Sequence, residues 1–218
     1  TAIAGSIFAV TKSAANYGDE LNKTSQKIGV SVEALGGLKY AAGLADLSFT
    51  ELTTGLKKLS EAMVDAASGK EKGAAFTALG LSAKNVRGEL KPTEDMLLEI
   101  ADRFAAMEDG AQKTAVAVDL FGRSGIQLIP FLNLGRSGIK ALADEAQRLG
   151  LVLTKEQAVA SEKFNDDLKR LEGAFKGLTV QMGTAFMPVL QQLVDSLNRA
   201  APALKLIALE ARGLAAVF

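Results

Sequence analysis

Histidine, cysteine and tryptophan are absent from this sequence. A histidine general base, a thiolate nucleophile, disulfide bonds and the usual zinc and haem ligands are therefore excluded. Any catalysis would depend on carboxylates, lysine, serine, threonine or tyrosine. Three arrangements of these residue types have a spacing that could bind a ligand or react.

The first arrangement is a repeated Gly-Arg-Ser-Gly-Ile sequence at residues 122–126 and 135–139. A glycine-rich turn at a helix N-terminus can hold a phosphate, and the clamp loop of RNA-binding KH domains has a similar form. A KH domain also needs a β-sheet, and the sequence predicts none. We therefore favour two ordinary connections between helices, in which glycine supplies a positive φ and serine caps the next helix.

The second arrangement is a pair of predicted short helices within residues 31–60, joined by residues 43–46, which could form a helix-turn-helix. Its second helix offers only Lys57 and Lys58 to a nucleic acid, and no arginine. Glu51 stands near the start of that helix, where a phosphate would lie. A structural helix pair is the favoured interpretation, and DNA recognition is the alternative.

The third arrangement consists of three adjacent carboxylate pairs: Glu94 with Asp95, Asp144 with Glu145, and Asp166 with Asp167. Neighbours on a helix point about 100° apart, so they cannot share one substrate. Solvated faces or favourable first-turn charges are the expected roles. The sequence therefore predicts no catalytic, cofactor-binding or metal-ligating residue, no cofactor, and no enzyme activity.

The elements that would carry these residues are predicted to be helices. At four places an apolar residue precedes Ser or Thr and a new apolar stripe begins, which predicts helix N-termini at Ser31, Ser48, Ser82 and Thr154. Ser48 with Glu51, and Thr154 with Gln157, have the spacing of a capping box. Gly29, Gly80 and Gly150 precede three of these starts and suit the left-handed residue after a helix.

Both ends of the chain have apolar or small residues at alternating spacings of four and three. The first series is Ile3, Ile7, Val10, Ala14, Tyr17, Leu21, Thr24 and Ile28. The second is Phe164, Leu168, Leu171, Phe175, Leu178, Met182, Ala185 and Val189. Such series need a partner helix, and packing within one chain and self-association both remain open.

The predicted fold class is all-α, with a compact middle of several helices flanked by two long heptad-patterned helices. We expect a long helix over residues 1–28, a compact domain over 29–153, and a long helix over 154–218. Pro188 and Pro202 are predicted to kink or break the last helix. Residues 126–132, interrupted by Pro130, are predicted to form a short buried helix, and a strand is the alternative.

Composition is consistent with a folded core, because 48% of the 218 residues are hydrophobic and 23% are charged. The 25 basic and 25 acidic residues balance, which argues against a dedicated nucleic-acid surface. The chain opens on Thr1 without a secretory leader, so we expect an internal fragment. The uncharged run 177–194 contains glutamines, glycines and a proline, which disfavour a transmembrane helix.

Several segments are similar to the core region of bacteriophage tail tape measure proteins. Residues 120–125 and 128–133, followed by Gly135, carry Phe-Gly, Ser-Gly and Pro-x-Leu-Asn elements of that family. The order and spacing of the similar segments agree over about residues 14–197. These segments also include residues 14–23, 28–35, 40–42, 76–81 and 175–189.

This resemblance implies a virion protein that lies in the lumen of the tail tube and is assembled in the host cytoplasm. Proteins of the family form extended, largely helical multimers that set tail length, and they leave the tube ahead of the DNA during infection. The implied partners are sister copies, tail tube and tail tip proteins, and tail assembly chaperones. Contact with DNA would be indirect, and contact with a membrane would follow ejection.

Two other functions are compatible with the same residues. One is a helical adaptor or effector domain of prophage origin, and the other is a nucleic-acid binder of the helix-turn-helix kind. The frequent glycine and proline turns would keep the chain shorter than the roughly 330 Å of one unbroken helix. We therefore expect a packing or docking module whose arms contact sister copies or tail proteins.

Overall fold

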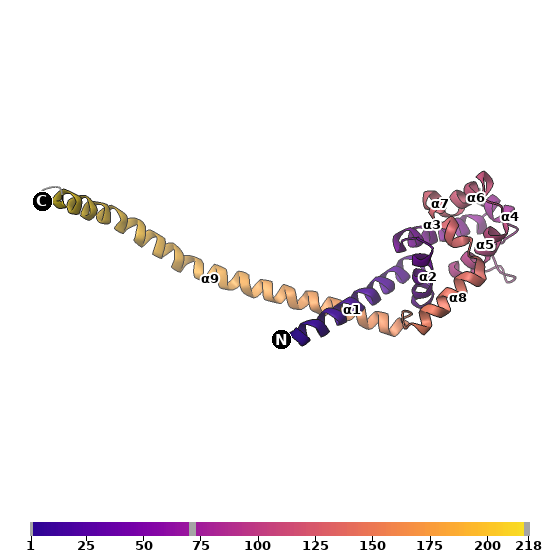
Figure 1. Cartoon of the computed structure of the whole chain (residues 1–218), viewed down its shortest axis with the longest axis horizontal. Helices are drawn as coiled ribbons and strands as arrows, with labels where there is room; N and C mark the ends of the chain where they lie inside the picture. The colour runs from indigo at the N-terminus through magenta and orange to yellow at the C-terminus, as the bar shows by residue number, and fades with distance from the viewer. Residues whose placement is uncertain (1, 70–72, 216–218) are drawn as a thin grey trace. The chain divides into compact units, whose positions relative to one another are not determined.

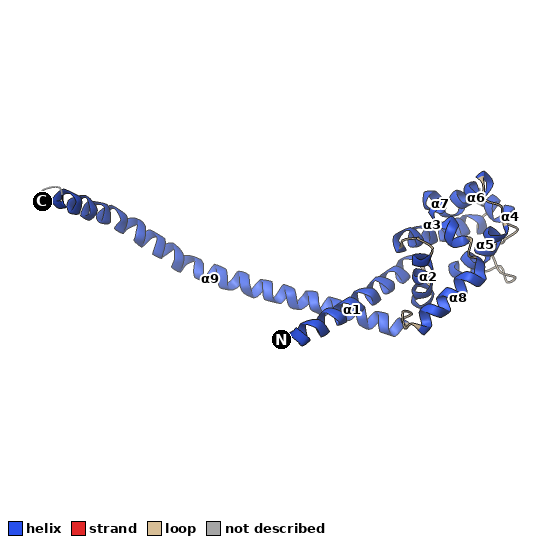
Figure 2. Ribbon diagram, viewed as in Figure 1, coloured by secondary structure: helices blue, strands red, loops and turns tan. Residues whose placement is uncertain are grey.

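The computed structural model describes residues 2–69 and 73–215, with side chains described for residues 6–69, 74–196 and 199. Of the chain, 81% is helical, and the described residues contain no strand (Figure 2). The predicted all-α fold class is confirmed. The ends of the predicted segments 1–28 and 154–218 lie outside the described residues. So do the side chains of Ile3, from the first heptad series, and of Leu197.

The chain divides into two compact units, Thr1–Asn165 and Asp166–Phe218. The first unit contains the predicted middle domain, the N-terminal helix and the first turns of the C-terminal helix. The boundary between the two units therefore falls inside the last helix. The reason is that the beginning of the last helix packs against the N-terminal helix within the first unit.

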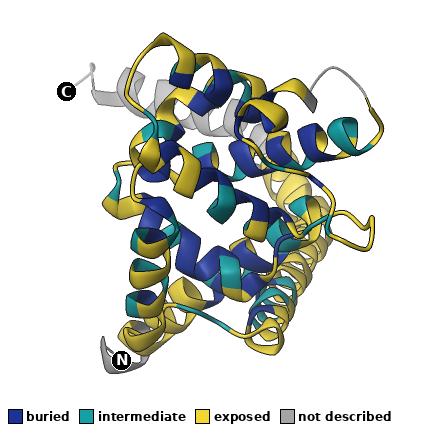
Figure 3. Cartoon of the chain, turned by 90° about the vertical axis from the view of Figure 1, so that its right-hand side faces the viewer, coloured by how far each residue is buried: buried dark blue, intermediate teal, exposed yellow. Residues whose placement is uncertain are grey.

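Apart from the 27-residue α1 and the first turns of α9, the α-helices of unit 1 have 6 to 19 residues (Figure 1). Helix α3 contacts most of the other helices of unit 1, and α2 packs along α8. Buried residues lie on several helices of this unit (Figure 3). They include the phenylalanines Phe76, Phe104, Phe121 and Phe131 and leucines such as Leu56. The bounds are α1 Ala2–Ile28, α2 Val32–Leu44, α3 Phe49–Ala67, α4 Gly73–Ala78, α5 Thr93–Ala106, α6 Ala111–Phe121, the 3₁₀ turn η1 Gly122–Ser124, α7 Gly125–Leu132, α8 Gly135–Arg148 and α9 Lys155–Ala215.

Three of the four predicted helix starts are confirmed. The Ser31 hydroxyl accepts a hydrogen bond from the backbone N–H of Ala34. Ser48 and Glu51 form the complete capping box of α3. Thr154 and Gln157 exchange the same pair of hydrogen bonds before α9. The glycines predicted to be left-handed, Gly29, Gly80 and Gly150, have φ values of 70°, 63° and 72°.

The predicted helix start at Ser82 is wrong. Residues 82–90 form a turn that contains one isolated antiparallel bridge, Lys84 to Leu90. The Asn85 side chain accepts hydrogen bonds from the backbone N–H groups of Arg87 and Glu89. This local bonding satisfies the backbone without a helix, as Asn side chains commonly do in turns. The next helix begins only at Thr93.

Residues 126–132 lie in α7, so the helix prediction is confirmed and the strand alternative is wrong. Pro130 is inside this short helix. The stretch Ala111–Leu132 is long and apolar enough to cross a membrane by length and composition alone, yet 44% of an 18-residue window within it is buried inside the structure. It comprises α6, η1 and α7, and the chain turns at Gly122, whose φ is 67°. These elements supply core residues of unit 1.

Helix α9 continues through Pro188 and Pro202. The predicted break at these prolines is therefore wrong, and the bend at either one stays a prediction. A proline inside a helix removes one hydrogen bond and crowds the preceding turn, but the helix can resume beyond it. Within unit 2, α9 is the only described element.

Candidate interaction surface

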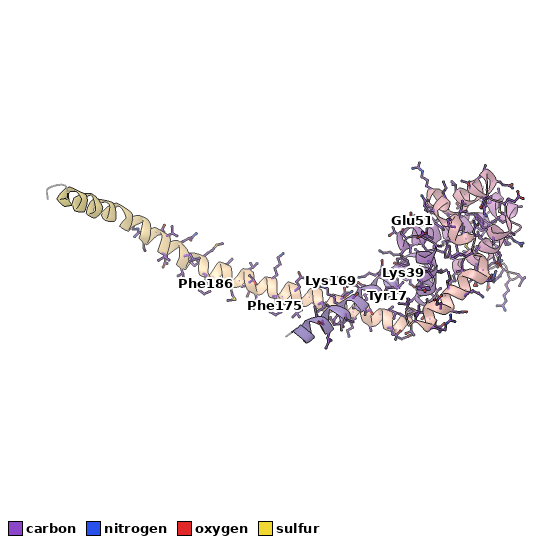
Figure 4. The ribbon with its side chains drawn as sticks, in the orientation of Figure 1. Tyr17, Lys39, Glu51, Lys169, Phe175 and Phe186 are labelled. Carbon is purple, nitrogen blue, oxygen red and sulfur yellow. The ribbon has the colours of Figure 1, made fainter. Side chains whose placement is uncertain are left out.

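The part of α9 that belongs to unit 2 carries large apolar side chains on its surface. Phe175 and Phe186 project from this helix (Figure 4). We call four exposed residues of its heptad series the seam, and the six large apolar residues that follow them the wide patch, which includes Val189 from the same series. All ten side chains are between 53% and 62% exposed. The seam is Leu171, Phe175, Leu178 and Met182, and the wide patch is Phe186, Met187, Val189, Leu190, Leu193 and Val194.

The seam forms one narrow stripe along the helix. With 3.6 residues per turn, its four side chains fall within an arc of about 60°. This is the pattern of a helix that packs against one other helix in a coiled coil. The charged residues Lys169 and Arg170 lie outside the stripe, and they pair with Asp166 and Asp167 on the same helix.

Leaving the seam in water is costly. Burying a large apolar side chain contributes roughly 1.5–3 kcal/mol. Since each seam residue is about half exposed, a partner helix would recover roughly 1 kcal/mol or more per residue. Gly173, Gly177 and Gly183 also weaken the helix by about 1 kcal/mol each relative to alanine. Few interactions within unit 2 therefore stabilise its long helix. A partner helix that covered the seam would add stability.

The start of α9 is fixed firmly to unit 1. Besides its own capping box, the helix receives a cap from α2, because the Glu33 carboxylate accepts a hydrogen bond from the backbone N–H of Lys155 at 2.8 Å. A carboxylate at a helix N-terminus is also favourable to the helix dipole. The first turns of α9 therefore have a defined direction within unit 1.

A polar clasp joins α1 to the first turns of α9, within unit 1. The buried Asn165 amide donates to Asn16 Oδ1 at 3.1 Å and to Asp19 Oδ2 at 3.2 Å. Asn22, also buried, donates to the Glu162 carboxylate. Buried amides at a helix interface specify register more than they add stability. The clasp therefore fixes how α1 and α9 meet.

Lys39 attaches α1 to α2 and α3. Its ammonium lies 4.7 Å from the ring centre of Tyr17 and 4.3 Å from that of Phe49, and it pairs with Glu20. Such cation–π contacts contribute about 0.5–2 kcal/mol each. The Tyr17 hydroxyl donates to the carbonyl of Leu151 at 2.8 Å, and burial, followed by the charge of Glu20, raises the pKa of Tyr17.

The sequence did not predict the clasp or the contacts of Lys39. The residues involved are far apart in the chain, and no local sequence pattern indicates that they meet.

The first heptad series has two different environments. Leu21 is fully buried and Tyr17 and Ile28 pack against the core, so this half packs within one chain. Ile7 and Val10, in the other half, are exposed. One of the two alternatives left open by the sequence is thus confirmed for the C-terminal half of α1.

Both Gly-Arg-Ser-Gly sequences lie at connections between helices, and their first glycines have positive φ values, as predicted. The prediction that serine caps the next helix is wrong. The Ser124 hydroxyl donates to the carbonyl of Phe121, and Ser137 lies inside α8. The start of α8 is instead held by Asp102, which accepts hydrogen bonds from the backbone N–H and the guanidinium of Arg136.

The predicted helix-turn-helix lies in unit 1, and the carboxylate pairs lie in both units. The predicted helix-turn-helix corresponds to α2 and α3, where Lys57 is exposed and Lys58 pairs with Glu61 at 2.7 Å. Glu94 and Asp95 occupy the first turn of α5, as expected for favourable helix-dipole charges. Asp166 and Asp167 form ion pairs along α9. Among the described residues, no group of three or more acidic side chains could hold a metal ion.

The described part of the chain is thus an all-helical protein whose most distinctive surface is an uncovered apolar stripe on one long helix. Comparisons with protein-family models, with curated proteins and with solved structures find no match to this chain.

Proposed function

We propose that this chain is a segment of a phage tail tape measure protein, a structural component that sets tail length and assists DNA ejection, and not a catalyst. In this role unit 1 is a compact module, and the N-terminal half of α1 and the part of α9 beyond Asn165 are arms that contact other helices. The arms would contact sister copies within the lumen of the tail tube, where tail tube and tail tip proteins surround them.

The observation that carries the proposal is the uncovered seam of α9. A long helix with a heptad stripe of exposed Leu, Phe and Met side chains suits a protein that works by packing side by side with similar helices. A helix also adds about 1.5 Å per residue whatever its sequence, which is the property that a length-setting protein needs.

The family-like segment 120–133 is compatible with the same proposal. Leu120, Phe121, Leu128, Phe131 and Leu132 are all fully buried in unit 1. The family-like residues of this segment therefore pack in the core of the compact module. A signature of this kind supports membership of a structural family more than it supports a binding site.

Native mass measurements on the full chain test the self-association that the proposal needs. Replacing Phe175 and Leu178 together by glutamate places charges in the seam, and we expect this variant to be monomeric in light scattering while the wild type is not. Replacing Thr184 and Gln191 by glutamate adds the same charge to the side of the helix opposite the seam and should leave the mass unchanged. A monomeric wild type at tens of micromolar concentration would contradict the proposal.

A further inference from the structure

Helices α1 and α3 of unit 1 carry the same short sequence pattern where they contact each other. Thr24 and Lys27 stand three residues apart near the end of α1, and Thr54 and Lys57 have the same spacing in α3. Residues three apart lie on one face of a helix, so each helix places a hydroxyl beside an ammonium. Both pairs line one hollow of about 460 Å³ between the two helices. Its lining consists of Thr24, Lys27, Ile28, Thr53, Thr54 and Lys57, and none of these residues is acidic.

The two lysines of the hollow have no ion-pair partner in the part of the chain that the structure describes. Glu61, the acidic residue four positions after Lys57, pairs with Lys58 at 2.7 Å. Lys27 lies in the last turn of α1, where a positive charge also favours the helix dipole, but Lys57 lies in the middle of α3. The hollow therefore gathers two positive charges that no acidic side chain neutralises.

Threonine hydroxyls supply further polar atoms in the hollow. Those of Thr53 and Thr54 donate to the carbonyl of Thr50, at 3.1 Å and 2.7 Å. The Thr24 hydroxyl has no hydrogen-bond partner among the described residues, so its proton is available to a ligand. Ile28 is the apolar member of the lining, and it packs against the core of unit 1. This packing holds the end of α1, and with it the lysine of α1, beside α3.

From these residues we infer that the hollow between α1 and α3 binds the dianionic phosphate group of a small molecule. Such a group carries a charge of about −1.5 to −2 at neutral pH and has several strong acceptor oxygens. Its charge matches two ammonium groups, and its oxygens can accept from them and from the free hydroxyl. A carboxylate carries only one charge and is best matched by the fork of an arginine, which the hollow lacks. The site belongs to unit 1, does not involve the seam and does not depend on the proposed function.

Binding relieves a repulsion that the free protein carries. Two ammonium groups that line one hollow repel each other, and an anion between them replaces this repulsion with two attractions. Lys27 and Lys57 are both exposed, so water and salt screen the interaction. We therefore expect a dissociation constant on the order of millimolar at low ionic strength.

The surroundings of the hollow favour a single phosphate group over a nucleic-acid backbone. DNA binding needs a series of unpaired basic residues that follow successive phosphates. The next lysine on α3, Lys58, is already paired with Glu61, and the formal net charge of the chain is zero. A phosphate group within a DNA backbone also carries only one charge.

Equilibrium dialysis of the full chain against radiolabelled inorganic phosphate, in a dilute buffer without other polyvalent anions, tests the site. We expect saturable binding of one phosphate per chain. Replacing Lys27 and Lys57 together by glutamine should weaken binding roughly tenfold or more, because both charged donors are lost. Replacing Lys12 and Lys84 by glutamine removes the same charge from exposed positions outside the hollow and should keep the wild-type affinity. Circular dichroism checks that both variants keep their helix content.

Equal weakening in the two variants would show that overall charge attracts the anion, and the inference would be wrong. Absence of saturable binding to the wild type at tens of millimolar phosphate would overturn it as well. Competition with unlabelled inorganic phosphate and with glycerol 3-phosphate identifies the source of the group, and preference for either one supports the inference. If a short DNA duplex displaces phosphate from the wild type, and its own binding is lost in the Lys27 and Lys57 variant, the hollow binds a nucleic-acid backbone and the inference fails.

Discussion

Two glycines occupy the same position in the repeated Gly-Arg-Ser-Gly sequence, and their surroundings differ. A Cβ atom on Gly125 would stand 2.1 Å from the backbone carbonyl oxygen of Ala117, where α6 and α7 approach each other. A Cβ atom on Gly138 would meet only the Leu134 side chain, at 3.1 Å. The first glycine is needed for close packing of two backbones, and the second is not.

Gly125→Ala should therefore destabilise unit 1 by about 2–3 kcal/mol, because the backbone of α6 must move to admit a methyl group. Gly138→Ala should be neutral or stabilising by up to about 1 kcal/mol, since alanine favours the helix interior. Urea unfolding followed by circular dichroism measures both. Equal destabilisation by the two substitutions would show that the contact with Ala117 is not what requires glycine.

The comparison of these glycines also shows what a sequence can predict at this scale. Positive φ at Gly122 and Gly135 was predictable, because the local sequence interrupts an apolar stripe with glycine. The close approach at Gly125 was not, because it depends on Ala117 in another helix. The same reason applies to Asn165 and Asn16, whose contact joins residues 149 positions apart.

Helix boundaries were predictable where a single side chain satisfies the backbone. At Ser48 the spacing to Glu51 defines both partners of the capping box within four residues. At Ser82 the same kind of sequence failed, because Asn85 accepts two backbone N–H groups and stabilises a turn before a helix can begin. A helix capped by Ser82 and a turn stabilised by Asn85 were both compatible with the sequence, which did not show which of them has the lower free energy.

The capping box of α3 gives a prediction with a pH dependence. Hydrogen bonds from the Ser48 hydroxyl and then from its backbone N–H lower the pKa of Glu51. Because the pKa in the folded chain is below the ordinary value of about 4.3, ionised Glu51 stabilises the fold above about pH 4.3. This contribution is lost as the pH falls through the lowered pKa.

Ser48→Ala should raise the pKa of Glu51 towards its ordinary value and cost about 1 kcal/mol of unfolding free energy at neutral pH. Carboxyl-detected NMR titration gives the pKa, and urea unfolding gives the stability. Ser68→Ala, at the other end of the same helix, serves as a control because the Ser68 hydroxyl donates to the carbonyl of Val64 and not to Glu51. An unchanged Glu51 titration in Ser48→Ala would contradict the assigned cause.

At the scale of the whole molecule, the two units differ in what stabilises them. Unit 1 has a continuous core, visible as buried residues on most of its helices (Figure 3). Unit 2 is a helix on which the large apolar side chains from Leu171 to Val194 are exposed. The heptad series predicted an interacting surface on α9, but a single chain cannot show which partner covers it, since that choice is made between molecules.

The proposed length-setting role predicts how insertions would act in a phage whose tape measure protein contains this chain. Duplicating residues 171–191 adds three heptads to α9 and should lengthen the tail by about 32 Å, at 1.5 Å per residue. Inserting 21 glycine and serine residues between Val86 and Arg87 adds the same number of residues to an exposed turn of unit 1. This second insertion should leave tail length unchanged, because the added residues form a loop beside the compact module. Electron microscopy of purified tails measures both, and tails of unaltered length in the duplication variant would contradict a length-setting role for α9.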